Sequence, residues 1–211
     1  MILRWMFYNF FVRPFITIVL GLNVRRQENL PKIGPAVIIA NHNSHLDTLV
    51  LMTLFRGKVI HSVRPIAAAD YFLRNKVLAW FSLNIIHIIP LDRKGSTDVE
   101  NLFNGVYEAL DNNHIVILFP EGSRGEPEKI ARLKSGIYHL LKERPSVPVY
   151  PVFMHGLGKS LPKGEAMFVP FFCDVFVGDE MYWTEDRKEF MEMVEMNMKS
   201  LAAEGSFPTW D

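Results

Sequence analysis

Short, continuously apolar runs alternate with longer segments of mixed character along most of this 211-residue chain. A short apolar run bounded by polar or turn residues is typical of a strand that a sheet buries on both faces. Such runs predict strands over 36–40, 85–91, 115–119 and 147–153, with shorter strands within 24–29 and 167–177. The other segments predict helices over 47–55, 71–83, 97–112, 130–144 and 184–204. The alternation indicates the α/β class, with a single domain whose mixed, largely parallel central sheet is flanked by helices.

The first 22 residues differ from the rest, because they are strongly apolar and aromatic. A stretch from Trp5 to Leu22 would just cross a hydrocarbon core, but Arg13 lies in its middle, with Pro14 after it. A central Arg costs about 2.5–3.5 kcal/mol on insertion, and a helix lying in the membrane interface avoids that cost. We therefore expect residues 1–22 to be a membrane-interfacial amphipathic segment, followed by one folded domain over 23–211.

Six residues are the predicted anchors of this segment. Two arginines would reach headgroups and four aromatic side chains would enter the acyl boundary: Arg4, Arg13, Trp5, Phe7, Phe10 and Phe11. The alternative is an ordinary helix docked on the domain as part of its core.

The charge of the chain is balanced overall and uneven along its length. Lys and Arg number 23, as do Asp and Glu, so no general attraction to nucleic acid is expected. Residues 1–28 carry four arginines and one acid, whereas residues 179–211 carry nine acids and three bases. The basic, apolar start favours contact with anionic phospholipid headgroups. Cys173 is the only cysteine, which excludes an internal disulfide and a cysteine-based zinc site.

A cluster of polar residues follows the predicted strand 36–40, with the sequence Asn41-His42-Asn43-Ser44-His45-Leu46-Asp47. At a strand–helix junction this spacing lets Asp47 fold back towards the ring of His42. A carboxylate bonded to one ring nitrogen fixes the tautomer, so that the other nitrogen can take a proton from a hydroxyl. The pattern predicts His42 as a general base and Asp47 as its orienting partner. The plainer alternative is that Asp47 or Ser44 only caps the following helix.

Two more polar segments follow the next predicted strands, at 91–95 and 119–125. Each delivers an Arg, whose planar fork suits phosphate oxygens, and glycines let backbone N–H groups approach an anion closely. Ligands of open α/β sheets bind beyond the carboxyl ends of strands, so we expect the three segments to meet in one pocket for an anionic lipid headgroup. Its candidate residues are Arg93, Glu121, Gly122, Arg124 and Lys134. A surface Asp–Arg pair and a solvated turn are the alternative.

Two other kinds of site are weaker explanations of the same residues. A metal could be held by His42, His45 and Asp47, but no matching ligand cluster stands out elsewhere in the sequence, so no metal is expected. A serine hydrolase would need a glycine two residues before its nucleophile, and Ser123 lacks one.

The polar segments resemble the motifs of the glycerolipid acyltransferase family, whose best-known members are 1-acyl-glycerol-3-phosphate acyltransferases. The family's Asn-His-x-Ser-x-x-Asp motif is matched by 41–47, and its Phe-Pro-Glu-Gly-Thr/Ser-Arg motif by 119–124. Its Pro-centred strand resembles 147–152. A further motif is partly kept, since Leu91-Asp92-Arg93 closes it, but His87 stands at a usual Gly and Pro90 at an apolar or aromatic position. The resemblance covers roughly residues 24–153.

The resemblance implies an O-acyltransferase without metal or organic cofactor. His42 would deprotonate the hydroxyl of a lysophospholipid, which then attacks the thioester of acyl-CoA or acyl carrier protein. The acceptor would most simply be 1-acyl-glycerol-3-phosphate, and the place of action the cytoplasmic face of the cell membrane. Further substrate-binding positions implied by the motifs are Asn41, Ser44 and Ser123. The competing functions are acylation of another lysolipid such as an aminolipid, thioester hydrolysis, and non-catalytic lipid binding at a membrane.

Overall fold

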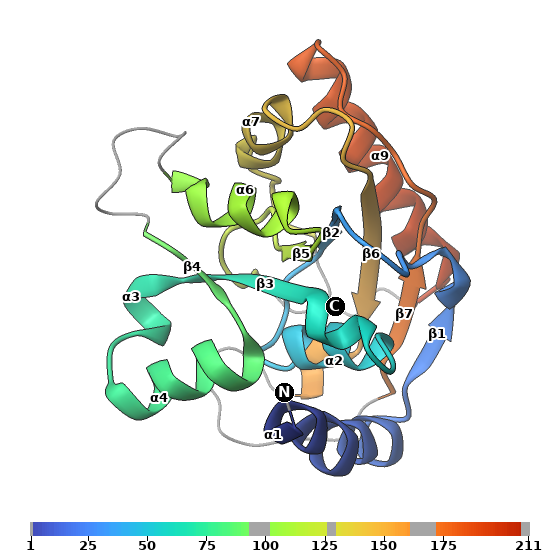
Figure 1. Ribbon diagram of the computed structural model, residues 1–211. Helices are drawn as coiled ribbons and strands as arrows, with labels where there is room; N and C mark the ends of the chain where they lie inside the picture. Colours follow the sequence, from blue (N-terminus) through green and yellow to red (C-terminus); the bar gives the residue numbers. More distant parts are fainter. Residues whose placement is uncertain (1, 93–101, 126–129, 161–171, 208–211) are drawn as a thin grey trace.

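One seven-stranded sheet runs through the middle of the molecule (Figure 1) in a computed structural model that describes residues 2–92, 102–125, 130–160 and 172–207. The strand order is β1-β7-β6-β2-β5-β3-β4, and only β6 and β7 pair antiparallel. The predicted mixed, largely parallel sheet is therefore confirmed. The strands are β1 (Asn23–Arg25), β2 (Ala36–Ala40), β3 (Val63–Ala68), β4 (Ile89–Leu91), β5 (Ile115–Leu118), β6 (Val149–His155) and β7 (Asp174–Val177).

The centre of the sheet is built from the continuously apolar runs of the sequence. β2 lies between β5 and β6, with Val37 opposite Val116 on one side and Val149 on the other. All five residues of β2 are buried, as expected for a parallel strand covered on both faces. This packing fixes where β2 ends, and with it the position of the polar loop that follows.

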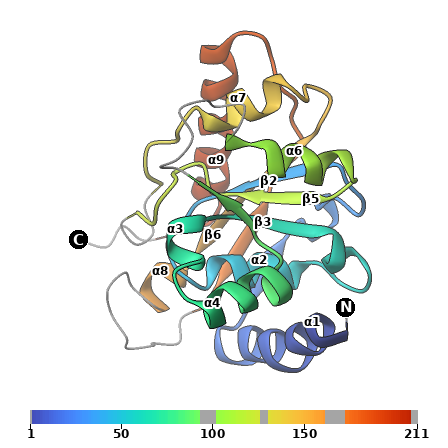
Figure 2. The same ribbon diagram turned by 60° about the vertical axis from the view of Figure 1, so that its left-hand side comes forward.

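Helices cover both faces of the sheet (Figure 2). Side chains of the N-terminal helix and α2 (Asp47–Leu54) share one buried cluster with β2, β5 and β7. Side chains from α6 (Asn104–Asp111), α7 (Gly136–Lys142) and α9 (Arg187–Glu204) share the other. The remaining short helical segments are η3 (Gln27–Asn29), η4 (Val59–Ser62), α3 (Ala69–Phe72), α4 (Lys76–Phe81), η5 (Ser82–Ile86) and α8 (Leu157–Ser160).

The N-terminal helix runs through α1 (Ile2–Met6), η1 (Phe7–Val12) and η2 (Phe15–Val19), the last two with π-helical bonding. By length and composition it is apolar enough to cross a bilayer. One side of the helix belongs to the core of the domain. Tyr8, Val12 and Ile16 are buried there, together with Leu20, the residue directly after the helix. Trp5, Phe10 and Phe11 are exposed on the other side, and Phe7 is partly buried against the core.

The structure corrects the expectation that Arg4 and Arg13 reach lipid headgroups. Arg4 is only 1% exposed, and its Nη2 donates to the carbonyl oxygens of Val63 (3.0 Å) and Ile86 (3.2 Å). Arg13 donates to the carbonyl of Phe55 at 3.1 Å. Carbonyls at the ends of helices and strands need donors when they are covered, and here the arginines of a docked helix supply them.

The largest error of the sequence-based prediction lies in residues 63–91. β3 was not predicted, and η5 extends through Ile86, so that only Ile89–Leu91 of the predicted strand 85–91 is extended. Pro65 interrupts β3 and Arg64 breaks its apolar run, which hid the strand. The predicted helix 71–83 is also divided, because Asn75 caps a new helix by accepting a hydrogen bond from the Leu78 N–H at 2.7 Å.

Candidate active site

Two neighbouring parallel strands deliver the main polar segments to one edge of the sheet. β2 and β5 are in register with Ile39 opposite Leu118, so the residues that follow each strand emerge side by side. Asn41 and His42 follow β2, while Phe119 and Glu121 follow β5. The predicted meeting of these two segments beyond the carboxyl ends of the strands is confirmed.

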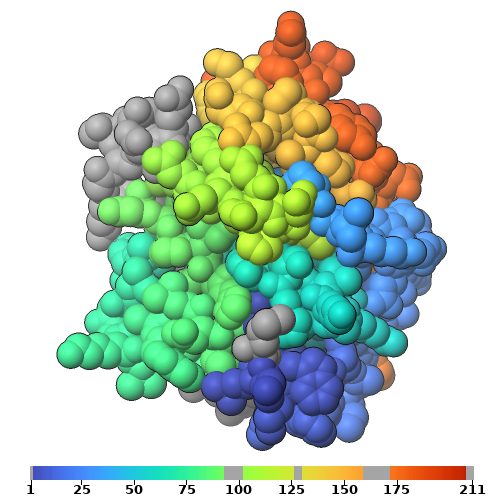
Figure 3. Space-filling view, viewed as in Figure 1, coloured from blue at the N-terminus to red at the C-terminus, as the bar shows by residue number. Residues whose placement is uncertain are grey.

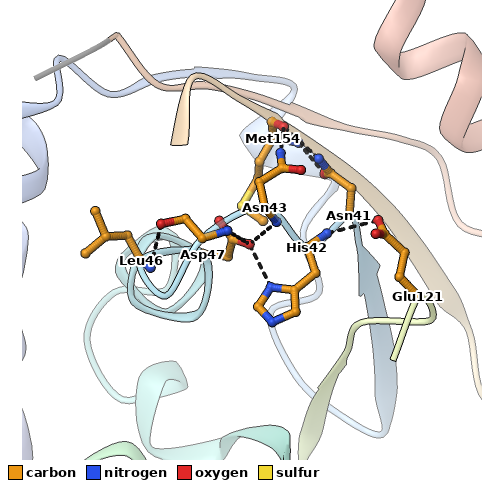
Figure 4. A network of polar contacts seen from close by, with 8 residues as sticks. Asn41, His42, Asn43, Leu46, Asp47, Glu121 and Met154 are labelled. Atoms are coloured by element: carbon orange, nitrogen blue, oxygen red, sulfur yellow. Dashed lines mark hydrogen bonds and ion pairs between the residues drawn. The ribbon is translucent and has the colours of Figure 1, made fainter. Parts of the chain in front are cut away.

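The predicted contact between His42 and Asp47 is present (Figure 4). His42 Nδ1 lies 2.8 Å from Asp47 Oδ2, and Asp47 lies in the first turn of α2. The same carboxylate oxygen accepts the backbone N–H groups of Asn43 (2.7 Å) and Ser44 (2.9 Å). The loop thus wraps around the carboxylate and aims it at the ring. Nε2, on the other side of the ring, points away from Asp47.

His42 and Asp47 differ in their exposure to solvent. Asp47 is fully buried, whereas the side chain of His42 is 22% exposed. Burial raises the pKa of Asp47, and the hydrogen bonds from His42 and the two backbone N–H groups oppose that rise. A carboxylate held in this way favours the tautomer with the proton on Nδ1 and favours the imidazolium once Nε2 is protonated.

The backbone and the ring of His42 are also fixed by residues after β5. The His42 N–H donates to Glu121 Oε1 at 3.0 Å, and its carbonyl accepts the Gly125 N–H at 3.0 Å. The imidazole stacks on the ring of Phe119, with centroids 4.3 Å apart and planes 22° from parallel. These contacts limit both the position and the rotation of the ring.

Glu121 therefore has a contact that the sequence did not indicate. It was predicted as a candidate residue of the headgroup pocket; it is 3% exposed, and its Oε1 accepts the backbone N–H of His42. Burial raises the pKa of its carboxyl, and the bond from His42 partly offsets the rise.

Asn41 serves the framework of the site (Figure 4). Its side-chain Nδ2 donates to the Met154 carbonyl and its Oδ1 accepts the Met154 N–H, both at 2.8 Å. Asn43 donates to the same carbonyl at 3.3 Å. Asn41 was expected to bind substrate, but it is fully buried and both polar atoms of its amide are engaged by β6. Ser44, another expected contact of the substrate, is buried too, with its Oγ accepting the Leu46 N–H at 3.3 Å.

The turn after β5 carries the cationic residues of the candidate pocket. Gly122 adopts φ +74°, a backbone conformation that favours glycine, and a Cβ at this position would lie 2.7 Å from Lys134 Nζ, so the end of the lysine side chain would have to move. The Lys134 N–H donates to the Pro120 carbonyl at 2.9 Å, which holds Lys134 beside the turn as predicted. Ser123 is exposed, and Arg124 is half-buried.

Arg124 and His45 lie close enough to interact. The positive charge of Arg124 contributes to lowering the pKa of His45, after burial. The ring of His45 stacks at 5.9 Å on Tyr71, which in turn lies 5.0 Å beneath the guanidinium carbon of Arg74.

Among the described residues no three His, Cys, Asp or Glu side chains form a group that could hold a metal ion.

The third predicted segment lies farther from His42 than expected. β4 ends at Leu91 on the same edge of the sheet, but β3 intervenes between β4 and β5. Neighbouring strands are about 4.8 Å apart, so two spacings separate the ends of β4 and β5. The segments are therefore not at adjacent strand ends. Arg93 itself lies outside the described residues.

His87 takes a backbone conformation that suits glycine, with φ 63° and ψ 47°. His87 occupies a position where the resembling family usually has Gly. The positive φ explains that preference, because glycine adopts this conformation without steric cost. Burial, together with the positive charges of Arg4 and Arg64, lowers the pKa of the imidazole to about 4.

Three parts of the site escaped the sequence-based prediction. They are the stacking of Phe119 on His42, the use of the Met154 backbone, and the contribution of Asn43. Phe119 was visible in the sequence as the aromatic first residue of the motif at 119–124, at the end of a predicted strand. The Met154 contact could not be found, because it depends on β6 pairing with β2 across more than a hundred residues.

Comparison with known proteins identifies a family model and several similar proteins. The model of the family described as Acyltransferase matches residues 21–155, which include both segments at the ends of β2 and β5. A chloroplastic 1-acyl-sn-glycerol-3-phosphate acyltransferase of Arabidopsis thaliana is 29% identical over 144 residues, which is 68% of this chain and 38% of that protein. The human 1-acyl-sn-glycerol-3-phosphate acyltransferase alpha is 28% identical over 157 residues, covering 74% of this chain and 53% of that protein.

A solved structure supports the same fold. The 1-acyl-sn-glycerophosphate acyltransferase PlsC from Thermotoga maritima superposes with a TM-score of 0.77 at 21% identity, over 97% of this chain and 80% of that one. The matched segments are about half, or less, of the length of the two curated relatives described above. Because the family model covers well over half of the chain, this protein belongs to the Acyltransferase family.

Proposed function

We propose that this protein transfers a fatty acyl group from a thioester to the free hydroxyl of a lysophospholipid, namely 1-acyl-glycerol-3-phosphate, and so forms phosphatidic acid. The observation that carries the proposal is the 2.8 Å contact between His42 Nδ1 and Asp47 Oδ2, in a chain of the Acyltransferase family. The names of the relatives supply the acceptor, since those proteins are 1-acyl-sn-glycerol-3-phosphate acyltransferases.

The proposed reaction needs one base and no covalent intermediate on the protein. His42 Nε2 takes the proton of the acceptor hydroxyl as its oxygen attacks the thioester carbonyl carbon. The tetrahedral intermediate then collapses, the C–S bond breaks, and the imidazolium returns the proton to the departing thiolate. Asp47 stays ionised and stabilises the imidazolium. The donor is acyl-CoA or acyl carrier protein, and no cofactor is required.

The acceptor is proposed to be held through its phosphate. Arg124 and Lys134 border the turn at 120–125, and Arg93 would add a second guanidinium. An Arg fork can bind two phosphate oxygens at once, so the phosphate would fix the distance between the acceptor hydroxyl and His42. Glu121, Asn41 and Ser44 support this geometry through the backbone around the base.

The membrane is the proposed source of the acceptor. The exposed aromatic side chains of the N-terminal helix, Trp5, Phe10 and Phe11, would enter the interface of the cell membrane on its cytoplasmic side. Deleting residues 1–22 is a poor test of this, because the deletion would also strip Tyr8, Ile16 and Leu20 from the core. Phe10→Asp and Phe11→Asp change only exposed positions and should release the protein from vesicles.

A product assay tests the reaction. The purified protein in detergent is incubated with labelled acyl-CoA or acyl carrier protein thioesters and a panel of acceptors: 1-acyl-glycerol-3-phosphate, lysolipids with other headgroups, and uncharged monoacylglycerol. We expect labelled phosphatidic acid, and a fall of at least about a hundredfold in rate for His42→Ala. Free fatty acid formed without acceptor would instead identify a thioester hydrolase. An acylated aminolipid would change the acceptor, and absence of any turnover would leave a lipid-binding protein.

Substitution of Arg124 tests the phosphate assignment. Arg124→Met should raise KM for the phosphate acceptor much more than for monoacylglycerol, whereas Arg132→Met, at an exposed position before α7, should change neither. Equal effects of Arg124→Met on both acceptors would remove Arg124 from the phosphate site.

A further inference from the structure

The helical segment formed by α4 and η5 exposes large apolar side chains on its outer side. Its inner side is covered by the domain, since Ser82 and Ile85 are buried and Phe81 is half-buried. Its outer side carries Val77, 80% exposed, Trp80, 54%, and Leu83, 43%, with the polar side chains of Lys76 and Asn84 exposed beside them. Leu73, in the turn just before α4, is 40% exposed as well.

α9 shows what a solvent-facing helix of this protein looks like. Phe190, Val194 and Met198 face the core, while charged side chains occupy the outer side. Lys188 lies 3.8 Å from Glu192 in an i,i+4 pair on that side. α4 and η5 instead expose Val, Trp and Leu, so water is not the environment that suits their outer side.

Charge favours an anionic neighbour for this part of the molecule. Residues 71–91 contain no acid, and Arg74 and Lys76 stand exposed at the start of α4. Asp70, just before this range, is the nearest acid to α4 along the chain. A contiguous apolar surface bordered by cations, with almost no carboxylates, is complementary to the headgroups and acyl boundary of an anionic bilayer.

Two contacts hold this surface beside the exposed side of the N-terminal helix. Phe7 and Phe81 meet edge to face with centroids 5.2 Å apart, and Arg4 donates to the Ile86 carbonyl at the end of η5. The two helices therefore lie next to each other along one rim of the molecule, as Figure 3 shows for the dark blue and green segments. Trp5 and Phe10 on one helix and Trp80 on the other are exposed.

We propose that α4 and η5 form a second membrane-contacting element, in which Val77, Trp80 and Leu83 enter the interface of an anionic bilayer together with the N-terminal helix. This inference rests on the proposed membrane association of the enzyme and adds a second point of contact to it. Two contacting helices fix the orientation of the domain relative to the bilayer. With the N-terminal helix alone, the domain could rotate about the axis of that helix. α3 then connects the bilayer to the site, because Tyr71 stacks on His45, three residues from His42.

Tryptophan fluorescence with brominated lipid tests the depth of α4 directly. In one variant Trp80 is kept and Trp5, Trp183 and Trp210 are replaced by Phe. In the matched control only Trp183 is kept, which packs against Tyr138 on the opposite helical layer. With vesicles of brominated phosphatidylcholine and phosphatidylglycerol, we expect a blue shift and strong quenching of Trp80, and no change for Trp183. A vesicle-bound protein whose Trp80 stays unquenched would overturn the inference and leave the N-terminal anchor standing.

Charge substitution gives a second readout that does not depend on fluorescence. Val77→Asp with Leu83→Asp should weaken partition onto the same vesicles by at least about tenfold. Met196→Asp, at an exposed position of α9, should not. Both variants should keep wild-type turnover of acceptor dispersed in detergent, which separates this inference from the proposed chemistry. Unchanged partition of the double variant, or self-association through α4 without lipid, would overturn it.

Discussion

Asn41 forms two hydrogen bonds with the backbone of Met154. Its Nδ2 donates to the Met154 carbonyl and its Oδ1 accepts the Met154 N–H, at 2.8 Å each. The contact joins the end of β2 to β6 one residue before the candidate base. The position of His42 is thus tied to the sheet itself and not only to the loop that carries it.

Asn41→Leu should lower the free energy of unfolding by about 2 kcal/mol, because the buried Met154 N–H loses its acceptor and the Met154 carbonyl keeps only the bond from Asn43 at 3.3 Å. Urea unfolding in detergent measures this. Asn112→Leu removes an amide that bonds the Glu108 carbonyl on the exposed end of α6, and should change stability by less than about 0.5 kcal/mol. Equal effects of the two variants would contradict the proposed clamp.

Asp47→Asn should reduce kcat by about 10²–10⁴-fold, because a neutral amide cannot support the imidazolium and can favour the wrong tautomer. KM for the acceptor should change little, since Asp47 is fully buried behind His42. Steady-state kinetics of Asp47→Asn, His42→Ala and the double variant measure the coupling. Residues acting as one unit should give a double variant little worse than His42→Ala, whereas additive losses would mean independent roles.

Gly122→Ala and Gly57→Ala separate backbone strain from displacement of Lys134. Both glycines have positive φ, +74° and +60°, so each substitution should cost about 1 kcal/mol in stability. Only at Gly122 would the new methyl meet Lys134, while nothing lies within 4 Å at Gly57. We therefore expect a raised KM for the phosphate acceptor with Gly122→Ala alone. The same KM in both variants would exclude Lys134 from the acceptor site.

Acid should destabilise the protein partly through His87. Its folded-state pKa is about 4, below the ordinary 6.5, so between these values the unfolded chain binds a proton that the folded chain does not. The free energy of unfolding therefore falls as the pH drops from 6.5 to 4. His87→Asn keeps a residue that tolerates positive φ and removes the titration. Denaturation across this window should show a shallower decline for the variant, by about 1–2 kcal/mol after solvent screening; parallel curves would assign the decline to other groups.

The centre of the sheet and the pairing of His42 with Asp47 were predictable from local information. Ala36–Ala40 and Ile115–Leu118 are short apolar runs followed at once by polar motifs, and parallel pairing brings such ends together. Spacing within one loop was enough to place Asp47 against His42.

What the sequence could not supply depends on contacts between distant segments. β3 is an interior strand with a proline in it, and without β3 the end of β4 was placed too near the site. The arginines of the N-terminal helix were expected to face lipid, because their carbonyl partners Val63, Ile86 and Phe55 lie at ends of β3, η5 and α2, which no local pattern brings to this helix. Glu121 was given a ligand role for the same reason, since its backbone partner lies 79 residues away.

The N-terminal helix has one side in the core of the domain, with Tyr8 and Ile16 fully buried. In the proposed membrane-bound state such a helix is not a flexible tether, so the candidate active site would keep a constant height and tilt above the leaflet. Its encounters with acceptor then become a search in two dimensions, governed by lateral diffusion in one sheet of lipid. Product released into the same leaflet would remain available to other membrane-bound enzymes that use it.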